Sequence, residues 1–529
     1  MAQESNSESS RPHWPGFLRQ RTALDFGFES NDAPVTALLQ SNRDLAKVTD
    51  AVLQLADESR SDARVRSALG EHRPICRLVV VISKNLESNP DVTKAALRCI
   101  GNACIDNDTA RSRALGLDMD WAKMCLESDN DDIKWLTVKV LYNICSSHEK
   151  SQQECYCDQR HHDLIVIATS PLAQQSDDRT LLFDLLFSIT GQKAHAVETG
   201  TDQPLAPEIL LRLLHLPYYH AAIADPDDFA TLVEITLTFL RDSAVQAEVI
   251  EHHWVGLVWQ IQQELDNKLS RLQAGANGPS ETKELLQPLA TSVMWCLSDI
   301  SAAPRFAEEY GLAHPLVDVL KRVLQSDPSQ VVAIPEQNFD QSELGQRLQS
   351  EARAGRPIEE AIGAVKVGDI MYATACQILG NVIHASRVDA IAPLVEQDGI
   401  HQAIWLKLVD TEEGSTSEEV QHSIAGLLIQ LTRPSVHTRE IIGADAKAQA
   451  GVETLWASKP PIKQDCARLL KALGRECPAN QRKFEELAGT VMAQLVQESR
   501  AASAAEGGSG ALAPAEEGAA QVRLLNDSS

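Results

Sequence analysis

Two stretches of the sequence share the pattern that decides the fold: AALRCIGNACIDND at residues 95–108 and LTVKVLYNIC at residues 136–145. Each has apolar residues spaced three and four apart and a polar residue near its end, Asn102 in the first and Asn143 in the second. This spacing places the apolar residues on one face of a helix. The first stretch then runs into a polar corner, so the pattern predicts a unit of helix and turn.

Helix-start signals precede both stretches. Ser88-Asn89-Pro90-Asp91 supplies a capping side chain and a proline for the first turn, and Ser128-Asp129-Asn130-Asp131 supplies capping side chains before Trp135. Alternation typical of β-strands is nearly absent from the chain. These signals favour helices throughout.

The pattern recurs along the whole chain. Most of its copies are separated by 41 to 50 residues, as measured at the polar positions Gln54, Asn102, Asn143, Ser188, Thr238, Asp299, Asn381, Gln430 and Arg475. That period is close to the roughly 40–47 residues of armadillo and HEAT repeats. Because one such unit cannot bury its own apolar face, neighbouring units must stack. We therefore predict an all-α fold, a right-handed α-solenoid of roughly nine armadillo/HEAT-like repeats.

Two intervals are longer than the others. The interval of 61 residues before Asp299 contains segment 273–283, and the interval of 82 residues before Asn381 contains the polar segment 325–366, which is either an insertion or a degenerate repeat. The predicted order of parts is a disordered N-terminal segment (1–30), N-terminal armadillo repeats (31–325), the insertion or degenerate repeat (326–366), C-terminal armadillo repeats (367–500) and a low-complexity tail (501–529).

Composition narrows the classes of function. The 529 residues include 48 Lys and Arg against 74 Asp and Glu, a formal net charge of −26. Proteins that coat nucleic acid or anionic membranes need positive surface, so this charge favours basic partners and argues against nucleic acid and membrane. The 11 cysteines do not suggest a disulfide framework, and we find no signal peptide, membrane span or lipidation motif. We expect a cytosolic protein.

The polar positions suggest a binding surface. In a stacked solenoid the last helix of each unit lines one concave surface, where an exposed stripe repeats every four residues. Asparagine both donates and accepts hydrogen bonds, so a row of asparagines can hold a peptide main chain, although any single one can equally bond to the next repeat. We predict a partner-binding groove of Arg98, Asn102, Trp135, Lys139, Asn143, Ser188, Glu234, Thr238, Trp295, Asp299, Gln377 and Asn381.

Acidic residues gather at the corners between helices. We predict a steering patch of Asp106, Asp108, Asp131 and Asp132, whose negative field attracts a basic segment of a partner. The alternative is that these residues are solvated loops and first-turn carboxylates that complement helix dipoles. For each corner alone this alternative is the stronger, whereas the total charge favours steering.

ALRCIGNACIDNDTARSRA and, one repeat later, WLTVKVLYNICSSHEKSQQ resemble the armadillo-repeat small-GTPase GDP-dissociation stimulators (SmgGDS-like proteins). GQKAHAVE (191–198) and WCLSDISAAPRF (295–306) are similar to fungal members. The resemblance implies a guanine-nucleotide exchange factor and chaperone for Rho- and Rap-type small GTPases with basic, often prenylated tails. It also implies a groove that engages the switch regions and an acidic patch that takes the tail. The groove pattern is matched at Asn102, Asn143, Asp299 and Asn381, and Ser188, Thr238, Gln430 and Arg475 depart from it.

Two other armadillo-type proteins are alternatives. The segment CPANQRKFEEL (Cys477–Leu487) is similar to ataxin-10, which implies a non-enzymatic interaction scaffold. An importin-α-type adaptor carries Trp-x-x-x-Asn pairs, a pattern that only Trp295 and Asp299 approach here. The basic N-terminal segment of such adaptors is missing, which argues against the import adaptor.

Catalytic motifs are absent from the sequence. We find no GxxxxGK[ST] phosphate loop, no GxSxG elbow and no HExxH. Cys155, Cys157, His161 and His162 are metal-ligand types, but structural zinc sites usually have two well-separated ligand pairs, so polar loop residues are the preferred interpretation. We therefore predict no catalytic residues, no metal and no cofactor, and at most a regulator of guanine-nucleotide exchange.

Overall fold

The computed structural model describes residues 35, 38–39, 45–117, 120–274, 280–326, 332–333, 342–354, 364–365, 367–409 and 416–506. Nearly all of them are in α-helices, and the chain divides into two compact units, Met1–Trp121 and Ala122–Ser529. The predicted N-terminal segment 1–30 and residues 507–529 of the predicted tail lie outside the described residues. Residues 501–506 continue the last helix.

The first unit is a small helical stack. Its helices are α2 (Leu45–Ser61), α3 (Ala63–Leu69), α4 (His72–Asn85), α5 (Pro90–Ala103) and α6 (Asp108–Leu115). Helix α5 begins as the sequence predicts, with the Asn89 side chain accepting from Val92 N–H and Pro90 in the first turn. Helices α2 and α4 both pack on α5, and Leu97 and Ile100 are fully buried between them.

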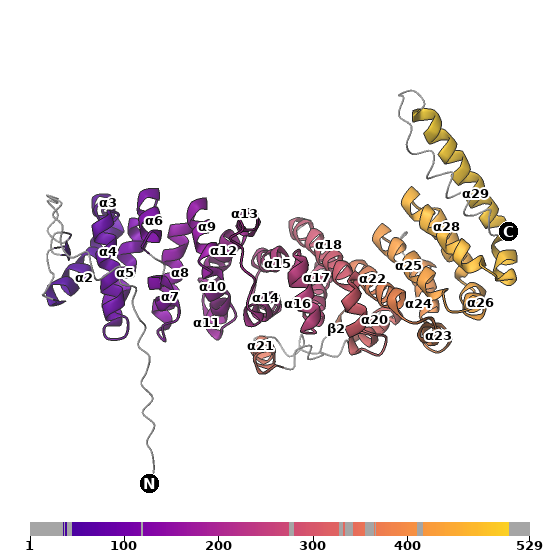
Figure 1. Ribbon diagram of the computed structural model, residues 1–529, viewed down its shortest axis with the longest axis horizontal. Helices are drawn as coiled ribbons and strands as arrows, with labels where there is room; N and C mark the ends of the chain where they lie inside the picture. The colour runs from indigo at the N-terminus through magenta and orange to yellow at the C-terminus, as the bar shows by residue number, and fades with distance from the viewer. Residues whose placement is uncertain are drawn as a thin grey trace, which may run out of the picture. The chain divides into compact units, whose positions relative to one another are not determined.

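The second unit contains one row of long helices in which each packs on the next (Figure 1). We call these the ladder helices: α8 (Asp131–Cys145), α12 (Arg179–Thr190), α15 (Pro226–Leu240), α18 (Ser280–Ala302), α22 (Asp369–Ala385), α25 (Glu418–Leu431) and α28 (Pro460–Gly474). Side-chain caps start several of them, including Asn130 before α8 and Asp225 before α15. The quoted pattern of the sequence is therefore the pattern of a ladder helix.

Two further helices precede each ladder helix from α12 onward. The first helices are α9 (Glu149–Cys157), α13 (Lys193–Thr199), α16 (Ser243–Glu251), α19 (Pro304–Glu309), α23 (Val388–Glu396) and α26 (Val436–Ala444). The second helices are α10 (Arg160–Ala168), α14 (Pro207–His220), α17 (Val255–Ala274), α20 (Pro315–Gln325), α24 (Ile400–Val409) and α27 (Ala448–Trp456). Short helices α7 (Asp120–Leu126) and α11 (Pro171–Gln175) and the long C-terminal α29 (Pro478–Glu506) complete the described set. This succession of stacked three-helix repeats is an α-solenoid.

The polar corner of the repeat has a specific backbone conformation. Asp106, Ser147 and Glu476 follow ladder-type helices α5, α8 and α28 and have left-handed φ angles of 51°, 53° and 53°. A residue with positive φ turns the chain sharply after a helix, and polar residues tolerate this conformation better than β-branched ones do. The corner residues of the sequence pattern thus end one repeat and start the next.

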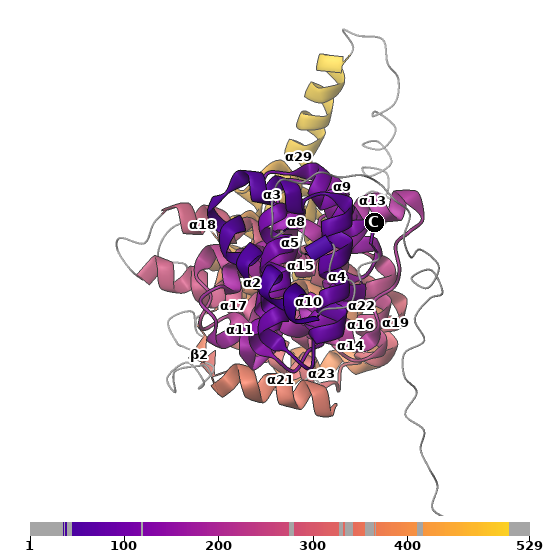
Figure 2. The same cartoon turned by 90° about the vertical axis from the view of Figure 1, so that its left-hand side faces the viewer.

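The long interval before Asn381 contains an inserted helix. Helix α21 (Glu343–Ala354) lies between α20 and α22 in the chain, and strand β1 (Val332–Ala333) pairs antiparallel with β2 (Ala364–Val365). Helix α21 packs on α14, far earlier in the sequence, at the lower edge of both views (Figures 1 and 2). Its Leu348 is buried against Tyr218 and Tyr219, and the Tyr219 hydroxyl donates to Glu351 Oε2 at 3.1 Å. The inserted segment is therefore an extra layer on an earlier repeat.

The interval of 61 residues before Asp299 is longer than the usual period because it contains two long helices. Helices α17 and α18, which flank segment 275–279, contain 20 and 23 residues. The segment itself lies outside the described residues. Among the described helices, none combines the length and apolar character needed to span a membrane.

Asp266 on α17 anchors the start of α22. Its Oδ2 accepts from Gly368 N–H at 2.6 Å, and a Cβ at Gly368 would lie only 2.7 Å from that oxygen. A larger residue at position 368 would therefore require the Asp266 carboxylate to move. Burial raises the pKa of Asp266 to about 7, against the effect of the hydrogen bond from Gly368.

Candidate binding face

The ladder helices are held in lateral register by side chains of the predicted groove. The Asn381 amide nitrogen donates to Ser301 Oγ at 2.8 Å and to the Ser298 carbonyl at 3.3 Å, which joins α22 to α18. On the other side, Gln377 Nε2 donates to Ser423 Oγ on α25 at 3.1 Å. The donor groups of these two residues therefore hold neighbouring repeats together.

Asn102 has the same role in the first unit. Its amide nitrogen donates to Ser59 Oγ on α2 at 2.9 Å, while Arg98, one turn earlier, is exposed. In the described parts of the chain, the Oδ1 atoms of Asn102 and Asn381 accept no hydrogen bond. Each asparagine thus acts as an inter-repeat strut through its donor and keeps its acceptor available.

The predicted groove residues of α8 are partly covered. Trp135, Lys139 and Asn143 are half-buried. The Lys139 ammonium pairs with Asp178 Oδ2 at 2.7 Å, just before α12. This part of the surface therefore already has its charges paired.

The hydroxyl groups of the predicted groove turn to their own helices. Ser188 Oγ donates to the Asp184 carbonyl at 2.8 Å, and Thr238 Oγ1 donates to the Glu234 carbonyl at 2.9 Å. These bonds to the carbonyl four residues earlier satisfy the hydroxyl hydrogens. The two hydroxyls still have acceptor capacity.

Three consecutive ladder helices carry a distinct exposed group, which we call the acidic-aromatic face: Asp184 and Phe187 on α12, Glu234 on α15, and Trp295 and Asp299 on α18. Trp295 is 51% exposed and Phe187 is 44% exposed. In the described part of the chain none of the three carboxylates forms an ion pair. Arg241, an exposed cation, stands at the C-terminal cap of α15.

The predicted steering residues fall in two different units. Asp106 and Asp108 follow α5 in the first unit, whereas Asp131 and Asp132 begin α8 in the second. Asp108 pairs with Arg111 at 2.9 Å and Asp131 pairs with Lys134 at 3.6 Å, each within its own helix. These contacts are those expected of first-turn carboxylates next to a helix dipole.

A group of exposed basic residues on the last ladder helices was not part of the predicted groove. We call it the cationic face: His384 on α22, His422 on α25, Arg433 after α25, Arg468 on α28 and Arg475 at the C-cap of α28. Two of these positions follow from the repeat pattern, since His422 lies eight residues before Gln430 and Arg475 is itself one of the polar positions. The stripe could therefore have been extended from the sequence.

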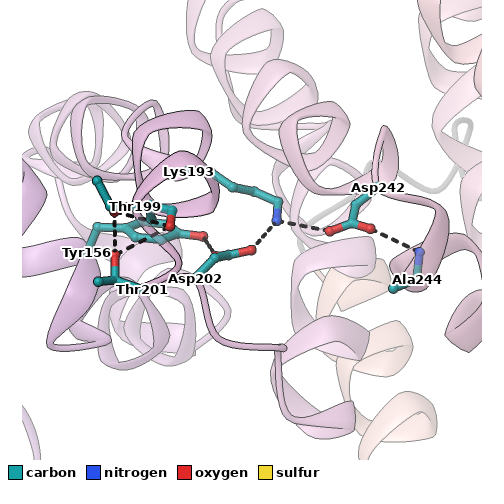
Figure 3. Close-up of polar contacts among 8 residues, drawn as sticks. Tyr156, Lys193, Thr199, Thr201, Asp202, Asp242 and Ala244 are labelled. Carbon is teal, nitrogen blue, oxygen red and sulfur yellow. Dashed lines mark hydrogen bonds and ion pairs between the residues drawn. The ribbon is translucent and has the colours of Figure 1, made fainter.

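A buried polar network joins the first helices of three successive repeats (Figure 3). Lys193 on α13 donates to Asp202 at 2.8 Å and to Asp242 at 3.1 Å, while the Tyr156 hydroxyl on α9 donates to Asp202 at 2.7 Å. Burial disfavours the charge on Lys193, but the two carboxylates outweigh it and raise its pKa. Asp242 also caps α16 by accepting from Ala244 N–H. The network is a strut between repeats, with every charge paired.

The residues with metal-ligand chemistry are engaged in packing. The sulfur atoms of Cys155 and Cys145 are 3.6 Å apart in the core, Cys157 donates to Thr201, and the His161 ring stacks on Tyr156. Burial lowers the pKa of His161, so its ring is neutral. Within the described residues, no three His, Cys, Asp or Glu side chains gather as a metal site.

No protein-family model matches the chain, and no curated protein matches it. Among solved structures, a protein titled as engineered is 16% identical over 88% of this chain and 93% of its own, with a TM-score of 0.41. A designed armadillo-repeat protein is 14% identical over 49% of this chain and 98% of its own, with a TM-score of 0.34. Another, in complex with the peptide (KR)4, is 15% identical over 50% and 97%, with a TM-score of 0.33. Similarities this low carry no inference about ligands or partners, and the fold assignment rests on the stacked helices themselves.

Proposed function

We propose that this protein is a non-enzymatic binding scaffold whose acidic-aromatic face takes a basic segment of a partner protein. The observation that carries the proposal is the exposure of Trp295 and Phe187 beside three carboxylates that form no ion pair in the described residues. Exposed aromatic side chains are typical anchors of protein interfaces. Carboxylates without internal partners supply a field that attracts cations.

The hydrogen-bonding character of the ladder also favours a basic partner. Asn381 uses its amide nitrogen for the strut to α18, and Ser188 and Thr238 use their hydroxyl hydrogens within their own helices. What remains on these side chains is acceptor capacity. Lys and Arg side chains are donors only, so they complement such a surface.

The finer proposal is that the partner is a small GTPase of Rho or Rap type with a basic, often prenylated tail, and that the two proteins meet in the cytosol. Its supports are the net charge of −26 and the sequence resemblance to GDP-dissociation stimulators. Stimulated GDP release needs no covalent chemistry from the scaffold. It needs tighter binding of the nucleotide-free GTPase, and a factor of about 10⁴ in relative affinity corresponds to about 5.5 kcal/mol. Chaperoning needs only the binding.

The basic-segment proposal is tested by fluorescence anisotropy of a labelled Lys/Arg-rich peptide with the full chain. The triple variant Asp184→Lys, Glu234→Lys, Asp299→Lys should weaken binding by about tenfold or more at low salt. A matched control carries the same charge change away from the ladder helices, at Glu198, Glu248 and Glu308, all of which are exposed. Equal affinity of the two variants would remove the acidic-aromatic face as the binding site.

The GTPase proposal is tested separately, by release of fluorescent GDP from Rho-, Rap- and Ras-type GTPases with and without their basic tails. Acceleration that depends on the tail supports exchange. Stable binding without acceleration supports a chaperone. If the GTPases show neither acceleration nor binding while basic-peptide binding is intact, the GTPase assignment is wrong. An interaction scaffold of the ataxin-10 type is then favoured.

A further inference from the structure

The exposed charge of the ladder changes from negative on α12, α15 and α18 to positive at Arg433, Arg468 and Arg475 of the last two ladder helices. The exposed carboxylates of the acidic-aromatic face are Asp184 and Glu234, near the middle of α12 and α15, and Asp299, in the last turn of α18. On α22, α25 and α28 the corresponding turns and the helix ends carry the cationic face, in which the His422 and Arg468 side chains are 57% and 62% exposed. Two surfaces of opposite sign therefore adjoin on one row of helices.

The reversal occurs on a continuous surface. Each pair of neighbouring ladder helices from α18 to α28 is linked by a side-chain contact: Asn381 with Ser301, His384 Nδ1 with Gln430 Oε1 at 3.4 Å, and His422 Nδ1 with Asp465 Oδ2 at 2.6 Å. These contacts fix the lateral register of the exposed stripes. A chain that crosses the acidic-aromatic face reaches the cationic face next.

Few carboxylates neutralise the cationic face. His422 and Arg468 share Asp465, which is buried, and the hydrogen bond to Asp465 raises the pKa of His422. Arg433 donates to the carbonyls of Ile383 and His384, which leaves its charge uncompensated. The described residues offer Arg475 no ion pair.

The exposed carboxylates of α22 and α25 lie in their first turns, and Glu418 and Glu419 are one turn before His422. Asp369 begins α22 and pairs with Lys407, and Glu418 begins α25 and pairs with Lys459. Glu419 stands beside Glu418 in the same first turn. The later turns and ends of α25 and α28 carry Arg433, Arg468 and Arg475, and the exposed carboxylate beside Arg475, Glu476, pairs with Arg439 at 3.7 Å.

We propose that the two faces together bind one extended partner segment with charges of opposite sign at its two ends. Lys and Arg residues of the segment lie on α12–α18, and its Asp and Glu residues lie on α22–α28. The inference rests on the proposed function and adds the chemistry of the partner segment. A wholly basic segment gains nothing beyond α18, because its charges would there meet Arg433, Arg468 and Arg475.

Helix spacing sets the length of the segment. Packed helices lie about 8–10 Å apart, so α12 to α28 spans about 50 Å. An extended chain covers about 3.3 Å per residue, so about 15 residues bridge the distance. About six of them face the acidic-aromatic face, about six face the cationic face, and about three cross between α18 and α22.

The experiment compares two labelled peptides of this length on the full chain. Both begin with a Lys/Arg block and a Gly/Ser spacer, and they end in either a Glu/Asp block (two-signed) or a Gly/Ser block (basic-only). The variants are Arg468→Glu with Arg475→Glu, the milder Arg468→Gln with Arg475→Gln, and a control, Lys150→Glu with Arg305→Glu, at exposed positions off the ladder helices. Circular dichroism confirms that each variant is folded.

The two-signed peptide should bind about tenfold more tightly than the basic-only peptide, and the Arg468/Arg475 variants should abolish that difference while the control preserves it. Equal affinity of the two peptides, or a difference that survives both variants, would overturn the inference and leave the proposed function standing. If, in addition, the Asp184/Glu234/Asp299 variant binds both peptides as tightly as the wild type does, the proposed function is wrong as well.

Discussion

Two sets of aspartate and glutamate residues in the second unit have opposite roles. Asp202, Asp242 and Asp266 are buried or partly buried and accept hydrogen bonds from a lysine, a tyrosine or helix N–H groups. Asp184, Glu234 and Asp299 lie on the ladder surface with no ion pair in the described residues. The same residue types therefore hold repeats together in one region and remain exposed in the other, and the difference is set by which residues the stack places beside them.

The largest expected effect is in the buried set. Lys193→Met leaves Asp202 and Asp242 without their cation, and because both carboxylates are only partly buried we expect a destabilisation of about 2–3 kcal/mol. Urea unfolding followed by circular dichroism should show a clear drop in midpoint. Glu234→Gln is the matched surface change and should shift stability by about 0.5 kcal/mol or less. Equal stability of the two variants would contradict the contrast between the two sets.

Asp266 should make stability depend on pH. Its pKa of about 7 in the folded state exceeds the unfolded value, so the folded state binds the proton more tightly. The resulting stabilisation is complete in acid below the unfolded pKa and is lost as the pH rises to about 7. As the pH rises from about 5 to about 8, the free energy of unfolding of the wild type should fall by about 2–3 kcal/mol relative to that of Asp266→Asn. Denaturant midpoints measure this difference. Parallel pH profiles for the two proteins would show that Asp266 is ionised at all these values.

Asn381 should affect the stack more than binding. Asn381→Ala removes the bond to Ser301, and such a hydrogen bond contributes about 1 kcal/mol. We expect a lower unfolding midpoint together with an affinity for the Lys/Arg peptide changed less than about twofold. Asn102→Ala is the equivalent change in the first unit. Loss of peptide binding at unchanged stability would instead make Asn381 part of the binding surface.

The smallest effect is expected at the corners. Asp108 and Asp131 pair within their own helices, so reversing Asp106 with Asp108, or Asp131 with Asp132, should slow association with a basic peptide less than about threefold. Stopped-flow measurements at low salt, done for each pair separately, compare them with the Asp184/Glu234/Asp299 variant. A larger decrease at either corner would restore that corner as the principal steering site.

The start of each repeat was predictable because the signals are local. Asn89 and Pro90 begin α5, and Asn130 begins α8, since capping depends on residues three positions apart. The role of each asparagine was not predictable, because the Ser59 and Ser301 partners of Asn102 and Asn381 lie 43 and 80 residues away. The contact between α21 and Tyr219 spans 132 residues, and no sequence spacing indicates it.

The sequence by itself determined the repeat, its period of about 45 residues and the apolar face of each ladder helix, because these depend on the order of neighbouring residues. It also determined the excess of negative charge. Only the tertiary structure decided where charge remains exposed. Stacking buries Lys193 between two aspartates and leaves Asp184, Trp295 and Arg475 on the surface. The reason is physical: burial and partners are properties of packed neighbours, which a solenoid brings together from successive repeats.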